Sequence, residues 1–337
     1  MKKVLIVVLL FVIIGEGVVF SFPRISAWHS QQKNQQTFST MFEQFPVTVD
    51  PKNKVIVENI DVNTFLNDAN SPFQASALNA VGAFWGVVDW LASSLTSEGW
   101  YQKIAGVAGT TARIVVITPG MRKEQVARAF AKALSWNTTQ TKQFTITTKS
   151  SPLPLPEGSF SPGTYLVNAN MTPQDVQTLV NNRFTEEILA HYGTTTAEKV
   201  PLDQALTIAS MIQREAGGTS DMRIISGIIW NRLFINMRLQ IDATVQYAKA
   251  NSSTVTSWWP KVTPADLSRK SPYNTYQNMG LPPTPISNPS VATVLAALNP
   301  VKTSCMYYFH DNAGQFHCSN TYVEHVALLK QYFGRGK

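Results

Sequence analysis

Apolar residues recur at the spacings of regular secondary structure along much of the 337-residue chain. The segment "ARIVVITPG" predicts a strand that ends in a turn, and the alternation in "QFTITT" predicts a second short strand. Between them, Lys123 to Leu134 predicts a helix with Val126, Phe130 and Leu134 on one face. The Pro-rich run from Ser151 to Gly158 continues neither a strand nor a helix, and is therefore the best candidate for a domain boundary.

Beyond this run, further helices are expected where capping residues precede apolar helical patterns. They are expected behind Thr172 with Pro173 first, behind Asp203, over Met222–Asn236 behind Ser220 or Asp221, from Asn288 with Pro289 through Leu298, and behind Thr321 with Glu324 three residues later. The segment "CMYYFHDNAGQFHCS" predicts two strands around a turn. The pattern therefore predicts a mixed α+β fold.

One predicted helix carries a carboxyl group on its apolar side. Its apolar residues Ala205, Ile208, Ala209 and Ile212 fall at helical spacing. Glu215 extends that series, because 208, 212 and 215 are i, i+4 and i+7, and Gly217 and Gly218 end the helix. Glu215 is therefore expected on, or at the edge of, the inward face at the C-terminal end of the helix.

An apolar position and the negative end of the helix dipole both disfavour the charged form of Glu215, so its pKa is expected to rise. Such a carboxyl group is protonated at working pH and serves as a general acid. The alternative is an ordinary ion pair between Glu215 and Arg214 or Arg232.

Asp242 lies 27 residues after Glu215 and is the obvious second carboxylate of a two-carboxylate glycosidase. Its alternative role is a helix cap before Ala243 to Tyr247. Further on, "SPYNTYQNMGLPPTPISNP" predicts a loop rich in neutral hydrogen-bonding groups and flat rings, which suits a sugar polymer.

The N-terminus predicts a membrane or export segment over residues 1–27. Lys2 and Lys3 precede nineteen residues, Val4 to Phe22, whose only charge is Glu16. A membrane anchor is the first interpretation and a cleaved signal peptide the second; both place most of the chain outside the cytoplasmic membrane. A second apolar stretch, Ala77 to Leu95, is interpreted as a buried or interfacial helix, because a second span would return the C-terminal part to the cytoplasm.

The composition of the chain excludes wholesale disorder and disfavours one class of partner, nucleic acid. Hydrophobic residues make up 44% of the chain, which excludes wholesale disorder. Charged residues are only 15%, below the ~25% of typical soluble domains. The 28 Lys and Arg exceed the 21 Asp and Glu, giving a net charge of +7, but no basic cluster is interleaved with aromatics. Nucleic acid is therefore a poor candidate partner.

Two cysteines lie in the predicted C-terminal hairpin. A disulfide between Cys305 and Cys318 would suit an oxidising compartment, but a four-residue turn would place Cys318 opposite Tyr307 rather than near Cys305. Pairing is therefore left open. A metal site formed by these cysteines with the histidines 310, 317 and 325 is disfavoured, because no ligand pair has closed-site zinc spacing.

From about Ile114 to Tyr332, the chain carries seven short motifs in the order in which one known protein family has them. The sequence has "ITPG", "PEGSFSPGTY", "ASMIQREAGG", "IIWNRLFINMRLQIDATVQYA", "SPYNTYQNMGLPPTPISNPS", "AALNPVKT" and "SNTYVEH". In this the chain resembles the endolytic murein transglycosylases, the MltG or YceG-like family. The resemblance implies a LysM-like module over residues 106–150, a YceG-like, lysozyme-like α+β catalytic domain over 151–337, and leaves residues 28–105 unassigned.

The resemblance also implies an activity: a lytic transglycosylase, a carbon–oxygen lyase that cuts within peptidoglycan strands and leaves 1,6-anhydro ends. It implies Glu215 as the catalytic residue, no cofactor or metal, and a groove for the glycan strand. The residues expected to line that groove are Gln240, Asp242, Tyr247, Tyr273, Asn274 and Tyr276. A single-pass protein of the cytoplasmic membrane with its catalytic domain outside also makes peptidoglycan synthases reasonable partners.

The chain departs from the family pattern at two places. Gly163 stands where an aspartate is usual, and Phe316 stands where the family has a histidine. His317 is one residue out of register and is expected on the opposite face of its strand. Two other functions stay open: a hydrolase in which Asp242 positions water, and a glycan-binding scaffold without activity.

Overall fold

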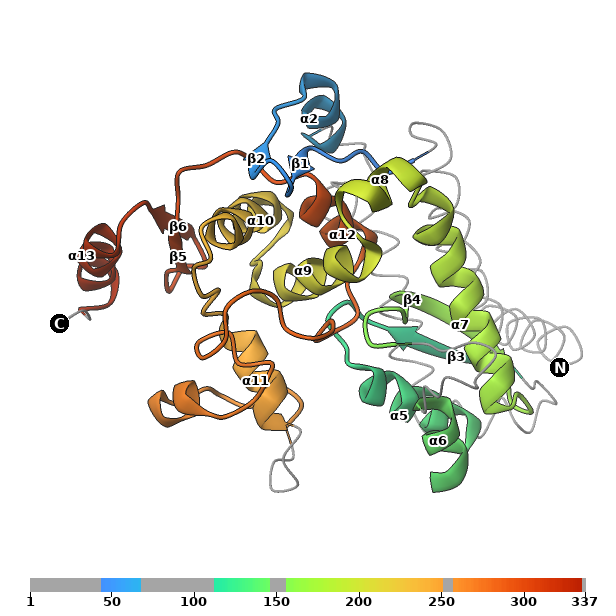
Figure 1. Cartoon of the computed structure of the whole chain (residues 1–337). Coiled ribbons are helices and arrows are strands. Elements are labelled where there is room, and N and C mark those ends of the chain that lie inside the picture. Colours follow the sequence, from blue (N-terminus) through green and yellow to red (C-terminus); the bar gives the residue numbers. More distant parts are fainter. Residues whose placement is uncertain (1–43, 68–111, 146–155, 251–256, 335–337) are drawn as a thin grey trace, which may run out of the picture.

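The computed structural model describes residues 44–67, 112–145, 156–250 and 257–334, which are coloured in Figure 1. Within these ranges the protein is mixed α+β and mostly helical, as predicted, and its strands form two-stranded antiparallel sheets. The strands are β1 (Val49–Asp50), β2 (Val55–Ile56), β3 (Ala112–Ile117), β4 (Gly163–Asn168), β5 (Tyr307–His310) and β6 (Phe316–Ser319). The α-helices are α2 (Ile60–Asn67), α5 (Lys123–Leu134), α6 (Thr138–Thr145), α7 (Pro173–Glu187), α8 (Thr194–Lys199), α9 (Leu202–Glu215), α10 (Thr219–Phe234), α11 (Asp242–Ala250), α12 (Val291–Leu298) and α13 (Tyr322–Phe333).

The predicted membrane or signal segment, residues 1–27, and the apolar stretch Ala77–Leu95 lie outside the described residues. Of the unassigned region 28–105, the structure describes residues 44–67, which form β1, β2 and α2 and pack against the main core through Val49, Ile56 and Leu66. Among the described ranges, none of the helices has the length and apolar character needed to span a bilayer.

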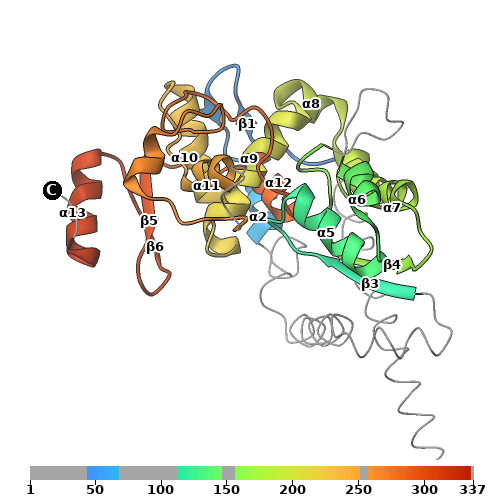
Figure 2. The same cartoon turned by 90° about the horizontal axis from the view of Figure 1, so that it is seen from below.

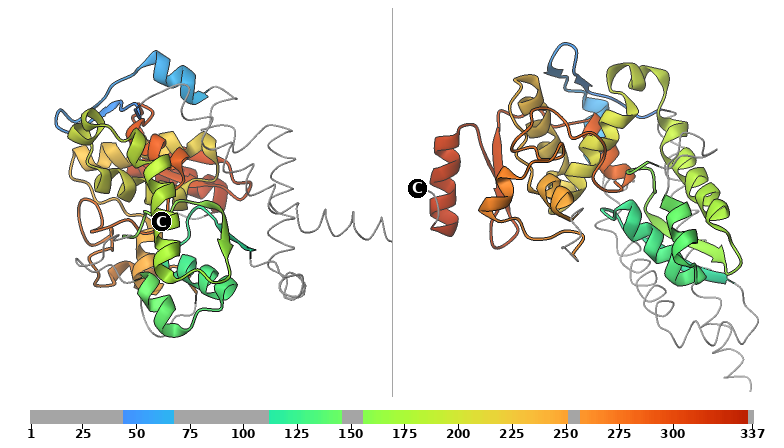
Figure 3. Two further views of the ribbon diagram at one scale, coloured as in Figure 1. Left: turned by 90° about the vertical axis from the view of Figure 1, so that its right-hand side faces the viewer. Right: turned by 60° about the horizontal axis from the view of Figure 1, so that its bottom comes forward.

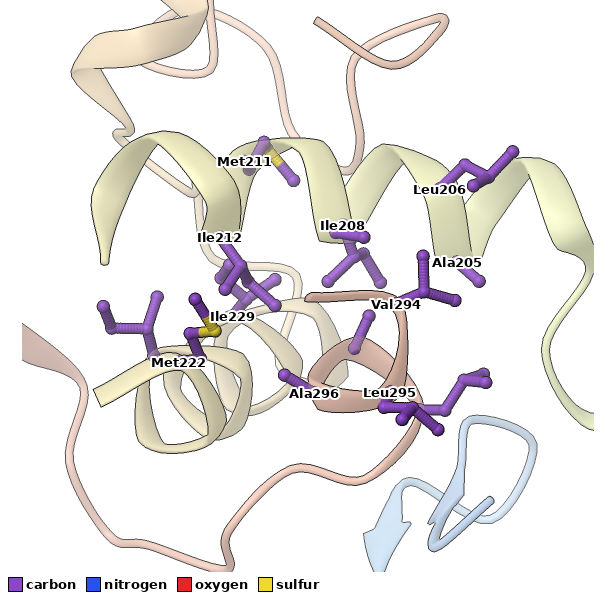
Figure 4. Packing of buried hydrophobic residues seen from close by; sticks show 14 of the residues in the cluster. Ala205, Leu206, Ile208, Met211, Ile212, Met222, Ile229, Val294, Leu295 and Ala296 are labelled. Atoms are coloured by element: carbon purple, nitrogen blue, oxygen red, sulfur yellow. The ribbon is translucent and has the colours of Figure 1, made fainter. Parts of the chain in front are cut away.

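The main core forms where α9 packs against α10 and α12. Figure 4 shows Ile208 and Ile212 of α9 facing Ile229 of α10 and Val294 of α12, and all four are at most 1% exposed. Trp230 is also buried, and its indole N–H donates to the Ala297 carbonyl at 2.9 Å, which ties α10 to α12. The helical spacing that predicted the apolar face of α9 is therefore confirmed.

Close approach of the chain to α10 depends on one glycine. A β-carbon on Gly227 would lie 2.2 Å from the Val301 carbonyl oxygen. The Val301 N–H donates in turn to the Arg223 carbonyl at 3.0 Å. The segment that follows α12 therefore runs along α10 at backbone contact distance.

A second, smaller core lies between the β3–β4 pair and helices α5, α6 and α7. β3 and β4 pair from Ala112 opposite Asn168 to Ile117 opposite Gly163. The aromatic rings of Phe130 and Phe144 meet at 5.5 Å inside this core. Its residues come from both sides of position 150, where the LysM-like module and the catalytic domain are predicted to divide. The predicted division into residues 1–27, 28–105, 106–150 and 151–337 stays a prediction.

The strand predicted over "QFTITT" is wrong for the part that the structure describes, because Thr138–Thr145 form helix α6. Asn137 and Gln140 start this helix: the Gln140 N–H donates to the Asn137 side chain at 2.9 Å, and the Asn137 N–H donates to the Gln140 side chain at 3.0 Å. This reciprocal cap satisfies N–H groups at the start of the helix and so stabilises its first turn.

Most other helix starts follow the capping residues, with shifts of a few positions. Thr172 caps α7 as predicted, accepting the Asp175 N–H at 3.2 Å. The predicted Asp203 cap is wrong, because α9 begins at Leu202 and Asp203 lies in its first turn.

The starts of α10 and α12 are also displaced. α10 begins at Thr219, where Asp221 accepts the N–H groups of Gly217 and Gly218, instead of at Met222. α12 begins behind Ser290, whose hydroxyl accepts the Thr293 N–H, instead of behind Asn288. The side chain of Asn288 is fully buried and accepts the N–H groups of Gly158 and Phe160.

The β5–β6 hairpin and α13 lie at the end of the molecule opposite β3, β4 and α5 to α7, as Figure 2 and the right-hand view of Figure 3 show. Cys318 lies opposite Tyr308, not Tyr307, because the connection is one residue longer than the expected four-residue turn. Cys305, which precedes β5, and Cys318 form a disulfide. Phe316 stacks on Tyr308, while His317 contacts Tyr332 of α13, as expected for adjacent residues on opposite strand faces.

Candidate active site

Glu215 is the last residue of α9, and its partly buried side chain meets groups from two other elements. The Tyr308 hydroxyl, on β5, donates to Glu215 Oε2 at 2.9 Å. The backbone N–H of Ala243, in the first turn of α11, also donates to the Glu215 carboxyl group. Three elements that are distant in the sequence therefore fix the position of this carboxyl group.

Burial raises the pKa of the Glu215 carboxyl group, and the nearby Asp242 charge raises it further. The hydrogen bonds from Tyr308 and Ala243 act in the opposite direction, but burial has the larger effect. The ion pair that was the alternative for Glu215 is absent from the described residues. Arg232 donates to the Met306 carbonyl at 2.7 Å, and the Arg214 guanidinium lies over an indole ring.

Asp242 is the exposed first residue of α11, and its Oδ1 accepts the Tyr276 hydroxyl at 2.7 Å. Gln240 precedes it in a left-handed conformation, with φ of 52°, and its N–H donates to the Thr275 carbonyl. The structure therefore brings Glu215, Gln240, Asp242 and Tyr276 together from among the residues predicted for the site.

Tyr247 and Tyr273 form a separate aromatic pair, with ring centres 4.8 Å apart. The guanidinium carbon of Arg122 lies 4.1 Å from the centre of the Tyr247 ring. Asn274 is fully buried, and its amide donates to the Leu267 and Arg269 carbonyls within its own loop. Its side chain therefore holds the loop in shape, and its predicted contact with glycan stays a prediction.

Two functional candidates could not be singled out from the sequence. Tyr308 lies 93 residues after Glu215, and only the hairpin register brings it to α9. Glu157 lies in the Pro-rich run that was assigned to a boundary. It is 4% exposed, accepts the Lys123 N–H at 2.8 Å, and has a pKa raised to about 8 by burial and by the Glu124 charge.

A histidine lies near the same end of α9. His310 Nε2 is 2.6 Å from Asp221 Oδ2, and its ring is close to Gly217. His310 and Asp221 form a pair rather than a metal site. Across the ranges that the structure covers, no cluster of three or more His, Cys, Asp or Glu side chains is placed to hold a metal ion.

The fold and the site define a class: a mixed α+β protein in which one partly buried carboxyl group, held by a tyrosine and a backbone N–H, stands at the end of a core helix. Comparison with known proteins gives the family. The model of the YceG-like family matches residues 90–331, and the chain belongs to that family.

Relatives agree with this assignment. The endolytic murein transglycosylase of Bacillus subtilis (strain 168) is 30% identical over 252 residues, which are 68% of this chain and 68% of that protein. The endolytic murein transglycosylase of Streptococcus pneumoniae (strain R6) is 28% identical over 170 residues, or 50% of this chain. The match spans only 31% of the pneumococcal protein's length.

A solved structure is also similar. The crystal structure of a YceG-like protein from Listeria monocytogenes matches with a TM-score of 0.54 and 29% identity, covering 64% of this chain and 75% of that chain.

Proposed function

We propose that this protein is a lytic transglycosylase that cleaves peptidoglycan within its glycan strands, between N-acetylmuramic acid and N-acetylglucosamine. The observation that carries the proposal is Glu215: a partly buried carboxyl group that has a raised pKa and forms no ion pair among the described residues. The names of the relatives, endolytic murein transglycosylases, support the same substrate and reaction.

One carboxyl group serves both steps of this reaction in turn. Protonated Glu215 donates its proton to the glycosidic oxygen, and the bond from that oxygen to C1 of the muramic acid breaks. The Glu215 carboxylate then accepts the proton of the C6 hydroxyl, whose oxygen bonds to C1 and closes the 1,6-anhydro ring. No water is consumed, and Glu215 ends the cycle protonated.

The surroundings of Glu215 suit both steps. Burial favours the protonated form that starts the reaction. The Tyr308 hydroxyl and the Ala243 N–H stabilise the carboxylate that exists between the two proton transfers, and they hold it in one orientation.

A hydrolase is the second candidate, because Asp242 is close enough to Glu215 to raise its pKa. In that reaction the Asp242 carboxylate, oriented by Tyr276, positions a water molecule, and the product is a reducing sugar. The two reactions differ by one water molecule in the mass of the product.

We also propose that the catalytic part works outside the cytoplasmic membrane, on a chain anchored by residues 1–27. The Cys305–Cys318 disulfide supports an oxidising compartment. Association with peptidoglycan synthases is part of this proposal. Crosslinking in intact membranes tests it, and an absence of enrichment of such enzymes would count against it.

The experiment for the reaction is a digest of purified peptidoglycan by the native protein and by Glu215→Gln in parallel, with products identified by mass spectrometry. We expect 1,6-anhydro-muramic acid ends from the native protein and none from the variant. Products one water heavier would assign the protein as a hydrolase. If the folded native protein binds peptidoglycan but does not cleave it, the remaining assignment is a glycan-binding scaffold without activity.

A further inference from the structure

The side chain of Arg214, the residue before Glu215, lies between the ring of Trp259 and the backbone turn at Gly120. Its guanidinium carbon is 4.1 Å from the centre of the Trp259 ring. Its Nη1 is so close to the turn before α5 that a β-carbon on Gly120 would lie 3.1 Å away. The guanidinium is thus held by an indole ring and a backbone turn, and it is near enough to Glu215 for the charge of that carboxyl group to raise the pKa of Arg214.

The N–H donors of Arg214 are not used within the described part of the chain, where the side chain makes no hydrogen bond and no ion pair, and its Nε is buried without a partner. Arg232, by contrast, donates to backbone carbonyls. Burial lowers the pKa of Arg214, since an unpaired cation is costly to remove from water. Glu215 is the adjacent acid, but its carboxyl group bonds Tyr308 and Ala243 instead.

The neighbouring tryptophan continues the same arrangement. The guanidinium carbon of exposed Arg128 lies 4.6 Å from the Trp258 ring, and that of Arg122 lies 5.6 Å from it. Guanidinium groups bind carboxylates through two parallel hydrogen bonds, and indole rings offer apolar faces on which the C–H face of a sugar ring packs. This alternation suits a polymer that presents both sugar rings and carboxylates.

We propose that Arg214, positioned by Trp259, binds a carboxylate carried by the muramic acid residue next to the bond that Glu215 cleaves. This inference rests on the proposed function. In peptidoglycan each muramic acid carries a lactyl group whose carboxylate is free or is extended by a peptide with carboxylates of its own, whereas N-acetylglucosamine carries none. Arg214 is therefore a specificity-determining residue that distinguishes the two sugars.

The test measures binding, so that it does not depend on cleavage. The full chain with Glu215→Gln is titrated with three forms of one uncrosslinked strand: with its peptides, with peptides removed to leave lactyl carboxylates, and with all carboxylates amidated. We expect amidation to weaken binding by about 10- to 30-fold, the loss of one charge-assisted hydrogen-bonding partner. Removal of peptides frees the lactyl carboxylate, which is an amide while the peptide is attached, and so decides between sources: gained affinity identifies the lactyl carboxylate, and lost affinity identifies a peptide carboxylate.

Three further substitutions in the same background locate the effect. Arg214→Gln should weaken binding of the tighter-binding carboxylate strand by the same factor and leave binding of the amidated strand unchanged, and Arg214→Lys should retain part of the affinity. Lys142→Gln, which removes one exposed positive charge from α6, should change neither. Equal weakening of carboxylate and amidated strands by Arg214→Gln, or no weakening, would overturn the inference. Failure of the proposed reaction is seen separately, as native digests without anhydro ends.

Discussion

Glu157 is a buried carboxyl group whose ionisation should make the stability of the protein fall as the pH rises. It is 4% exposed, and its Oε1 accepts the Lys123 N–H at the start of α5. Asn288, from the segment before α12, donates to the same oxygen at 3.4 Å. The substitution Glu157→Gln keeps a carbonyl oxygen for these donors and removes the titration.

The size of the effect follows from two pKa values. The pKa of Glu157 is about 8 in the folded protein, against an ordinary value of 4.5. Below pH 4.5 the group is protonated in both states and burial costs nothing from charge. Between the two values the unfolded chain releases the proton and the folded chain keeps it, so stability is lost by about 1.4 kcal/mol per pH unit, and by up to about 5 kcal/mol above pH 8.

The assay is urea unfolding followed by tryptophan fluorescence at pH 5, 6, 7 and 8, for the native chain and for Glu157→Gln. The free energy of unfolding of the native chain should fall relative to that of the variant as the pH rises. Glu198→Gln, which removes an exposed charge on α8, serves as the control and should leave the pH dependence of the native chain unchanged. A native-to-variant difference that is constant from pH 5 to pH 8 would refute the burial argument.

Three further outcomes are expected. Tyr308→Phe removes a donor to the Glu215 carboxylate, which should raise the Glu215 pKa further and move the alkaline limb of the pH–rate profile to higher pH, while kcat falls. An alkaline limb at the same pH in both proteins, measured by release of soluble products, would contradict this. Gly227→Ala places a methyl group against the Val301 carbonyl and should lower the urea unfolding free energy by on the order of 3 kcal/mol, and a loss under 0.5 kcal/mol would show that the backbone gives way. Reduction of the hairpin disulfide should destabilise the folded state by about 3 kcal/mol in thermal unfolding, and a variant with both cysteines replaced by serine should not respond to reductant.

The sequence predicts those features that depend on local spacing. Ile208, Ile212 and Glu215 share one side of α9 because the helical period alone places them there, and Thr172 fixes the start of α7 through a contact within three residues. The antiparallel hairpin of β5 and β6 is also local, but its register changes with a single residue in the turn.

The features that sequence reasoning missed depend on contacts between distant segments. Tyr308 reaches Glu215 across 93 residues, and β4 pairs with β3 across the Pro-rich run, so no short pattern in the chain encodes either contact. Glu157 was missed for a similar reason, since its burial is created by Lys123 and Asn288, which lie 34 and 131 positions away.

The hydrogen bond between Tyr308 and Glu215 also makes the site sensitive to interrupted synthesis. A chain that stopped before β5 would still contain α9, α10 and α12, whose buried faces pack against one another, and would still carry Glu215. It would lack the tyrosine that orients that carboxyl group. The order in which the ribosome makes these segments therefore delays completion of the site until the hairpin has emerged, well after the helices that hold Glu215.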